Sequence, residues 1–455
     1  MLRACRWAFV STLALAVSIG APLGAAGGPT IKFTDLRLKN GLRVIISEDH
    51  TAPTVSVAVT YNVGSADEKA RRTGFAHLFE HMMFKGSENV GPGEHFALVF
   101  NNGGSMNGTT NEDRTLYFDT MPANQLALAL FLESDRMKSL DISKANLDNQ
   151  RNAVQEERRL GLDNQPYGRT YERVGEQAYD NPAYKHSVIG SMEDLNAASV
   201  DDVATFFKTY YAPNNAVLSI VGDVDTKKTM VLIEKYFGVI TRQPQPKRPD
   251  LTEAPHTAER RSTIDDPLAR LPQVDIAWVT PPAGTPDFET LDVVSWVLSS
   301  GRSSRLNQVV VREKQLAVNA GAFNPDKRGP GLFQMSAQVA PGKSPADVEA
   351  ALYEEVEKVK NGPIADWEIE KAHNNAIRQR AGAATSTLTR AIQLGEYALF
   401  YDDPNLINTR AEHYQKITAA DVQRVAKKYL TRENRSVVIT MPKAGTGTGG
   451  KGGRP

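Results

Sequence analysis

The chain has 455 residues, of which 41% are hydrophobic and 23% charged, a composition typical of a globular protein and not of a disordered one. Its 53 Lys and Arg residues balance 53 Asp and Glu residues, and this neutrality argues against a basic surface for nucleic acid. The length exceeds what one compact core usually holds, so two domains are expected.

Residues 1–26 have the order of a secretory signal peptide: two arginines, an apolar run over 8–21, then small residues up to Ala26. Cleavage after Ala26 would export the chain, and the periplasm is the expected destination. A membrane anchor is the alternative, but the run is short and broken by polar residues, so no stable membrane insertion is expected. A mitochondrial presequence fits less well, because the run is too continuous for an amphipathic, arginine-rich helix.

The one cysteine of the sequence, Cys5, lies inside this leader. A mature chain would therefore have no disulfide, no reactive thiol and no thiolate metal ligand. After the leader, periodic patterns predict a mixed order of strands and helices. The expected strands cover 42–46, 55–61 and 115–119, and the expected helices cover 75–85, 123–138 and 144–160.

The helix expected over 75–85 carries the pattern His-x-x-Glu-His, formed by His77, Glu80 and His81. Residues four apart lie on one helix face, so the two histidines can point at one metal ion. Zinc binds neutral imidazole nitrogens and keeps a position open for water in catalytic sites. Glu80 beside them can act as general base toward that water and then protonate the leaving amine. The pattern is the inverted form of a metallopeptidase signature.

Two histidines on the polar face of an ordinary helix are the alternative without function. The remaining residues of this helix argue against it, because they are apolar and predict a largely buried environment: Phe75, Leu78, Phe79, Met82 and Met83. Buried polar side chains need partners, and a metal ion would be one.

An internal repeat organises the chain. Six residues spread over 202–220 recur in the same order and spacing over 421–439, and both segments have the pattern of a helix that leads into an apolar strand. The helix starts match as well, since Ser199 and Thr418 each stand three residues before an aspartate. Coincidence between two amphipathic helices is the alternative, but identities in register across two elements favour two copies of one α+β unit.

The repeat and the composition predict a domain at 27–241, a proline-rich linker at 242–262, a second domain at 263–445 and a disordered glycine-rich tail at 446–455. Residues 292–301 occupy the place of the metal helix in the second copy and carry no such motif. The two remaining histidines of that copy, His373 and His413, are expected to be exposed. Chemistry is therefore expected in the first copy alone.

A later polar helix carries the run Val-Gln-Glu-Glu-Arg that ends at Arg158. With the His-x-x-Glu-His motif, this run resembles the pitrilysin (insulinase) family of zinc peptidases. The closest resemblance is to its half-length branch, which includes the mitochondrial processing peptidase and bacterial relatives. The resemblance covers essentially the whole mature chain. It implies one Zn2+ per chain with Glu157 as third ligand, not Glu156. Gln150 stands where the family often has a second acidic residue.

The family resemblance also implies two homologous domains, each a mainly antiparallel sheet flanked by helices, and a peptide substrate bound as an added β-strand. The candidate strand covers 105–109, where Asn107 matches the position nearest the scissile bond and Gly108 stands where Ala is more usual. An exposed edge binds any extended peptide through backbone groups, which predicts short or unfolded peptides as substrates. A plain glycine-rich turn is the alternative for this stretch.

One departure from the family concerns catalysis. Active members usually supply an Arg and a Tyr from an inactive domain to grip the substrate and polarise its carbonyl. Here Arg312 is present, but Val318 occupies the tyrosine position and cannot donate a hydrogen bond to an oxyanion. The expected partner is therefore a homologous subunit that lacks the zinc motif and keeps the pair, with the site inside a closed chamber; a homodimer is the alternative.

The sequence thus predicts an exported zinc endopeptidase, with Glu80 as catalytic base and Asn107, Gly108 and Arg312 as substrate-binding residues. Two other functions stay open. A non-catalytic core subunit, as in respiratory complexes of this fold, would usually have lost the metal motif, which is intact here. A dedicated peptidase that trims leaders or cofactor precursors would use the same residues.

Overall fold

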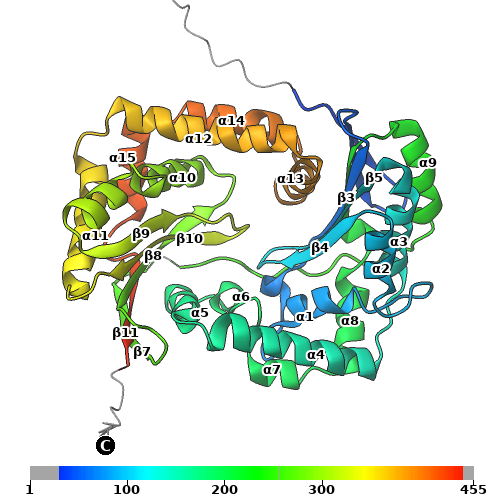
Figure 1. Ribbon diagram of the computed structural model, residues 1–455, viewed down its shortest axis with the longest axis horizontal. Helices are drawn as coiled ribbons and strands as arrows, with labels where there is room; N and C mark the ends of the chain where they lie inside the picture. Colours follow the sequence, from blue (N-terminus) through cyan, green and yellow to red (C-terminus); the bar gives the residue numbers. More distant parts are fainter. Residues whose placement is uncertain (1–29, 255, 444–455) are drawn as a thin grey trace, which may run out of the picture.

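The computed structural model describes residues 30–254 and 256–443; the predicted signal peptide (1–26), Cys5 and the predicted tail (446–455) lie outside these ranges. Two β-sheets occupy opposite sides of the molecule, with helices around and between them (Figure 1). No helix of the described ranges combines the length and the apolar character needed to cross a bilayer.

The first sheet has six strands in the order β1-β2-β6-β3-β5-β4. β2 and β6 pair in parallel, whereas the other neighbours are antiparallel. The strands are β1 Thr34–Arg37, β2 Arg43–Glu48, β3 Thr54–Tyr61, β4 Ser105–Thr110, β5 Thr115–Pro122 and β6 Ala216–Gly222. β4 lies at one edge of this sheet and therefore has backbone groups without a neighbouring strand.

The helices of the first half surround this sheet and connect its strands. They are α1 Phe75–Met82, α2 Glu94–Asn101, α3 Leu126–Lys138, α4 Lys144–Arg158, α5 Gly168–Ala178, α6 Pro182–Lys185, α7 Met192–Asn196, α8 Val200–Tyr210 and α9 Thr226–Tyr236. Short 3-10 turns are η1 Ser65–Asp67, η2 Ala123–Gln125 and η4 Pro213–Asn215, and a π-helical turn, η3 Arg159–Asp163, extends α4.

The second sheet has five strands in the order β7-β11-β8-β10-β9, of which only β7 and β11 pair in parallel. Its strands are β7 Arg260–Asp266, β8 Gln273–Pro282, β9 Ala317–Phe323, β10 Pro330–Val339 and β11 Arg435–Pro442. The helices of this half are α10 Pro286–Ser299, π-helical η5 Leu306–Glu313, α11 Pro345–Asn361, α12 Asp366–Thr385, α13 Thr387–Phe400, α14 Leu406–Gln415 and α15 Ala419–Tyr429. The predicted α+β class with mainly antiparallel sheets is confirmed.

The predicted repeat is visible in the strand order, because β7-β11-β8-β10-β9 repeats β2-β6-β3-β5-β4. α8 and α15 both begin with a capping box, at Ser199 and Thr418. The repeated asparagines also do the same work: the side-chain amides of Asn215 and Asn434 donate to the last turn of the preceding helix, each at 2.8 Å. The identities thus mark a helix-to-strand turn that both copies need.

Each half gives one helix to the sheet of the other. α13 lies beside β3 and β6 of the first sheet (Figure 1), and buries Leu394 and Ala398 against Ala58 and Val217. Its partner in the repeat, α5, packs on β8 and β11 of the second sheet. Because full burial of one large apolar side chain is worth about 1.5–3 kcal/mol, this exchange holds the halves together.

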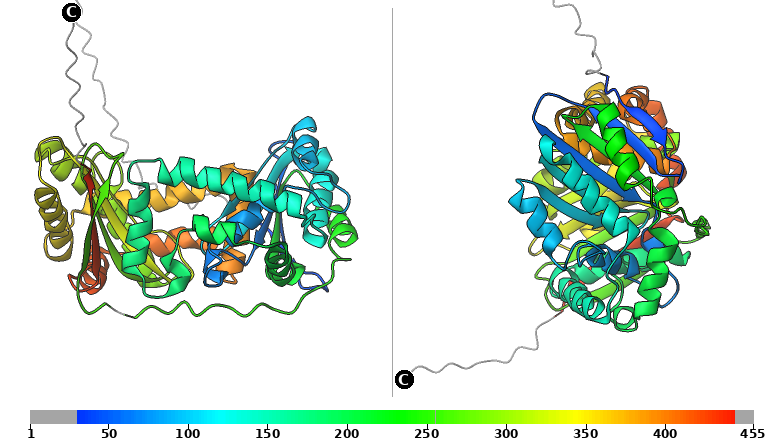
Figure 2. Two further views of the ribbon diagram at one scale, coloured as in Figure 1. Left: turned by 90° about the horizontal axis from the view of Figure 1, so that it is seen from below. Right: turned by 90° about the vertical axis from the view of Figure 1, so that its right-hand side faces the viewer.

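The exchange bears on the predicted domains. The predicted bounds place α5 in the domain 27–241 and α13 in the domain 263–445. In space, α5 covers the second sheet and α13 covers the first, so these bounds stay a prediction. The segment between α9 and β7 runs along one side of the molecule between the sheets (Figure 2). The predicted linker 242–262 covers most of this segment and extends into β7, which begins at Arg260. Residue 255 within it is outside the described ranges.

The expected exposure of His373 is wrong. Its ring is half-buried, and Nε2 lies 3.0 Å from the carbonyl oxygen of Ile417. The ring of His413 is 42% exposed and pairs with Glu289 at 3.5 Å.

Candidate metal centre

The start of α1 is fixed by two features. Gly74 precedes the helix at a φ of 87°, a left-handed conformation that favours glycine, and a Cβ there would lie 2.5 Å from the carbonyl oxygen of Ile189. The buried carboxylate of Glu68 accepts hydrogen bonds from the backbone N–H groups of Gly74 and Ala76, at 2.9 and 2.7 Å. These bonds satisfy helix N–H groups that have no partner within the helix, so the motif is held at a defined place.

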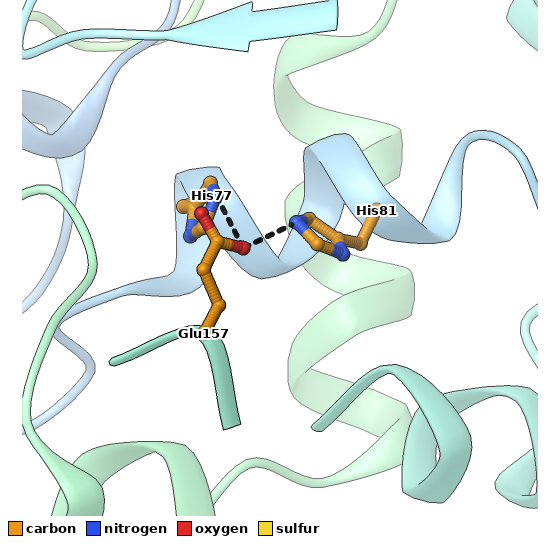
Figure 3. Close-up of side chains that lie close together, drawn as sticks. All are labelled: His77, His81 and Glu157. Carbon is orange, nitrogen blue, oxygen red and sulfur yellow. Dashed lines mark ion pairs between the residues drawn. The ribbon is translucent and has the colours of Figure 1, made fainter. Parts of the chain in front are cut away.

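The side chains of His77, His81 and Glu157 meet between α1 and α4 (Figure 3). Oε2 of Glu157 lies 3.7 Å from Nε2 of His77 and 3.3 Å from Nε2 of His81. One ligand atom from each residue lies within 4.8 Å of the other two. The two imidazole rings are steeply inclined, with an interplanar angle of 82°, so their Nε2 atoms approach one point from different directions.

The protonation states suit a metal ion. Burial, helped by the neighbouring His81, lowers the pKa of His77 to about 4, so this imidazole is neutral near pH 7 and has a free lone pair. The hydrogen bond with His81 lowers the pKa of Glu157, which keeps that carboxylate ionised. Within the described ranges, the buried Nδ1 of His77 has no hydrogen-bond partner. Two imidazoles and a carboxylate form a donor set that fits zinc.

The geometry distinguishes Glu157 from its neighbour. Glu156 points to solvent, where its carboxylate pairs with Arg159 at 3.0 Å. Arg158, on the other side, anchors the end of α4 by donating to the carboxylate of Glu172 at 2.7 and 3.0 Å and to the carbonyl oxygen of Gly190 at 2.6 Å. Successive helix residues are turned by about 100°, so only one of the two glutamates can face α1.

Two further groups of metal-type side chains occur in the described ranges: His95 with Asp119 and Glu133, and Asp180 with Glu253 and His256. Each already contains a cation, since Arg136 donates to Glu133 at 3.0 Å and Arg260 donates to Asp180 at 3.1 Å. An arginine repels a second cation and neutralises one carboxylate. In the described part of the chain, the group of His77, His81 and Glu157 forms no ion pair with a Lys or Arg side chain.

Glu80 lies on α1 between the two histidines and is 9% exposed. Its Oε2 accepts a hydrogen bond of 2.5 Å from the hydroxyl of Thr110 on β4. Burial raises the pKa of Glu80, while this hydrogen bond acts in the opposite direction. A carboxylate with a raised pKa next to a metal centre is suited to accept and return a proton.

The expected substrate-binding residues lie in two separate parts of the molecule, with Asn107 and Gly108 on β4 and Arg312 in η5. Asn107 is exposed on β4, and Oδ1 of its side chain accepts a hydrogen bond of 2.9 Å from the backbone N–H of Gly108. Arg312 lies in the last turn of η5 and Val318, 45% exposed, lies in β9, so both belong to the second sheet's side of the molecule. α1 instead contacts β4 and α4 of the first half.

Thr110 and Glu68 were not predicted from the sequence. Thr110 stands two residues after Gly108, so the alternation of a strand places both on one face, and that spacing could have suggested a common neighbour. Glu68 gave no local signal, because it precedes the helix by a loop and reaches its N-terminus only through the fold.

Sequence comparison places these residues in a family. The profile "Insulinase (Peptidase family M16)" matches residues 43–191, and "Peptidase M16 inactive domain" matches residues 197–376, so that the two together span most of the chain. The chain belongs to the insulinase family of peptidases. The first match contains His77, Glu80, His81 and Glu157, and the second begins after them.

Individual relatives agree with the half-length branch of this family. The chain is 28% identical to "Zinc protease PqqE" of Helicobacter pylori over 433 residues, which cover 94% of this chain and 97% of that protein. It is 24% identical to the "Probable mitochondrial-processing peptidase subunit beta, mitochondrial" of Arabidopsis thaliana over 420 residues, 89% of this chain and 77% of that one. The crystal structure of a protease from Helicobacter pylori superposes with a TM-score of 0.86 at 28% identity, over 90% of this chain and 100% of that one.

Proposed function

We propose that this insulinase-family member is an active zinc endopeptidase, with His77, His81 and Glu157 as metal ligands and Glu80 as general base. The observation that carries the proposal is the convergence of the three ligand atoms within 4.8 Å of one another, with the buried Glu80 beside them. Zinc held there would supply a Lewis acid that polarises a peptide carbonyl and acidifies water.

The protein's own groups would move the proton. Glu80 takes it from the attacking water and delivers it to the leaving amine, and burial favours this exchange because it raises the pKa of the carboxyl. β4 presents free backbone groups at the sheet edge beside α1, so an extended peptide can add there as a strand. Short or unfolded peptides are the substrates that this arrangement favours.

The test is hydrolysis of a mixture of internally quenched peptides by the purified chain that starts at Gly27. The wild-type chain should carry one zinc ion and cleave, and Glu80→Gln should carry the same zinc and lose about 10²–10⁴-fold in rate, which is the usual contribution of a general base. Equal cleavage by both proteins would end the proposal. A zinc-free chain without activity would favour the alternative, a non-catalytic subunit.

A homologous second subunit is part of the proposal. The exposed Val318 has no group that could donate to an oxyanion, so a partner that keeps both Arg and Tyr would complete the site inside a closed chamber. Purification from the native source should give a heterodimer; a homodimer with full activity would exclude this partner.

Export by residues 1–26 is tested by the N-terminus of the native protein, which should be Gly27. A dedicated leader peptidase would instead cut one defined precursor and spare the mixture.

A further inference from the structure

We propose that Thr110 is the positioning residue for the catalytic base. It would hold Oε2 of Glu80, so that Oε1 is the oxygen that takes and returns the proton beside the docked peptide. This inference rests on the proposed function, because it concerns how the base of that reaction is aimed.

The two oxygens of Glu80 have different neighbours on β4. Oε2 accepts the 2.5 Å hydrogen bond from Thr110. Oε1 faces Gly108, where a Cβ would lie 3.0 Å from this oxygen and 3.1 Å from Cγ of Glu80. Thr110 and Gly108 are two residues apart and therefore face the same side of the strand. The strand thus contacts both oxygens, one by a hydrogen bond and one by close packing.

The same residue that touches Oε1 offers its backbone to the peptide. Opposite residues of an antiparallel pair alternate between bonded and non-bonded pairs. Asn111 donates to Arg114 at the hairpin end, so the pair of Gly108 with Tyr117, three steps along the register, is a non-bonded one. The N–H and C=O groups of Gly108 therefore point away from β5, toward the free edge.

The hydrogen bond of Gly108 agrees with this direction, because its N–H bonds to the side chain of Asn107 and not to β5. A peptide that adds to the edge would replace Asn107 at that donor. The backbone of the bound peptide would then pair with Gly108, and Gly108 is also the residue that contacts Oε1 of Glu80. One strand therefore sets both the position of the peptide and the position of the base.

The geometry needs Thr110 because the last torsion of a glutamate is broad and does not fix its oxygens by itself. In the described ranges, Thr110 is the one residue with a hydrogen bond to the carboxylate of Glu80. Without that bond the carboxylate can turn about its last torsion, and small misplacements of a reacting group are costly, with about 1 Å enough to lose about 10²-fold in rate.

The experiment compares Thr110→Val, which keeps the shape and removes the hydroxyl, with Thr110→Ser, which keeps the hydroxyl. Thr120→Val is the control, because the hydroxyl of Thr120 on β5 forms a side-chain hydrogen bond with Ser56, away from Glu80. Zinc per chain, kcat and KM are measured with one quenched peptide. Thr110→Val should keep its zinc and its KM within about twofold and lose about 10- to 100-fold in kcat.

Thr110→Ser should restore kcat to within a few-fold of wild type, and Thr120→Val should match wild type. Unchanged kcat in Thr110→Val, a change confined to KM, loss of zinc, or a Ser variant as slow as the Val variant would each overturn the positioning role. If the wild-type chain cleaves peptides but the Thr110 variants give one of these contradicting results, only the positioning role falls and the proposed function stands. A zinc-loaded wild-type chain that cleaves no peptide would remove the proposed function and this inference together.

Discussion

Exchange of Glu157 for Gln, with Glu156→Gln as its matched control, is the sharpest test of the metal centre. The substitutions have the same chemistry, lie next to each other on α4 and differ only in where the side chain points. Oε2 of Glu157 lies 3.3 and 3.7 Å from the two imidazole Nε2 atoms. The side chain of Glu156 is 56% exposed and pairs with Arg159 at the surface.

The structure sets very different magnitudes for the two changes. Loss of a partner one shell away from a metal costs about 10- to 100-fold in affinity, so loss of a direct ligand should cost at least about 100-fold, or about 2.8 kcal/mol. An exposed ion pair such as that of Glu156 is worth about 0–1 kcal/mol, and it does not touch the metal, so zinc affinity should change by less than about fivefold.

Zinc dissociation constants can be measured by competition with a chromophoric chelator at one pH, on chains whose circular dichroism matches that of wild type. The expected order is wild type, then Glu156→Gln close to it, then Glu157→Gln far weaker. Equal weakening by both substitutions, or the reverse order, would refute the assignment of Glu157 as third ligand.

Three other outcomes are expected. Burial raises the pKa of Asp292 to about 7 from an ordinary 3.8, so its contribution to the free energy of unfolding is complete below about pH 4 and is lost as the pH rises through 7. The free energy of unfolding should therefore fall over that range by an amount on the order of 4 kcal/mol, measured as a falling thermal midpoint, and Asp292→Asn should flatten this dependence on pH; an unchanged dependence would contradict it. Leu394→Ala in α13, at a fully buried position, should cost about 2–5 kcal/mol and weaken amide protection in β3 and β6 of the first sheet; loss of protection confined to the second sheet would exclude the exchange of helices. Gly108→Ala should keep its zinc and slow kcat several-fold, because the new Cβ must displace the carboxylate of Glu80 by a few tenths of an ångström; a rate equal to wild type would show that the carboxylate has room to move.

Local pattern determined much of this protein. The spacing of His77 and His81 was sufficient to predict a shared ligand face, because a helix repeats every 3.6 residues whatever surrounds it. The apolar flanks of the same helix predicted the burial found for Glu80. The repeat also followed from sequence, since capping boxes and the turn asparagines Asn215 and Asn434 are local devices that each copy must keep.

Resemblance supplied what local pattern could not. Nothing in the run of residues on α4 distinguishes Glu157 from Glu156, since both are acidic residues of one polar helix. Their difference lies in the direction of α4 relative to α1, which is fixed by the anchoring of Arg158 to Glu172 and Gly190, residues distant from the motif in the sequence.

Tertiary structure alone decided the remaining features. The sequences of α5 and α13 do not indicate which sheet each helix covers. An amphipathic helix fits any apolar sheet face of suitable shape, and the chain connections decide which sheet it reaches. The contact of Thr110 with Glu80 joins residues from a strand and a helix that are separated by another helix and a loop. Periodicity acts within one element, whereas these contacts depend on how separate elements pack, and so sequence predicted the proposed ligands on α1 but not the hydrogen bond of Thr110 with Glu80.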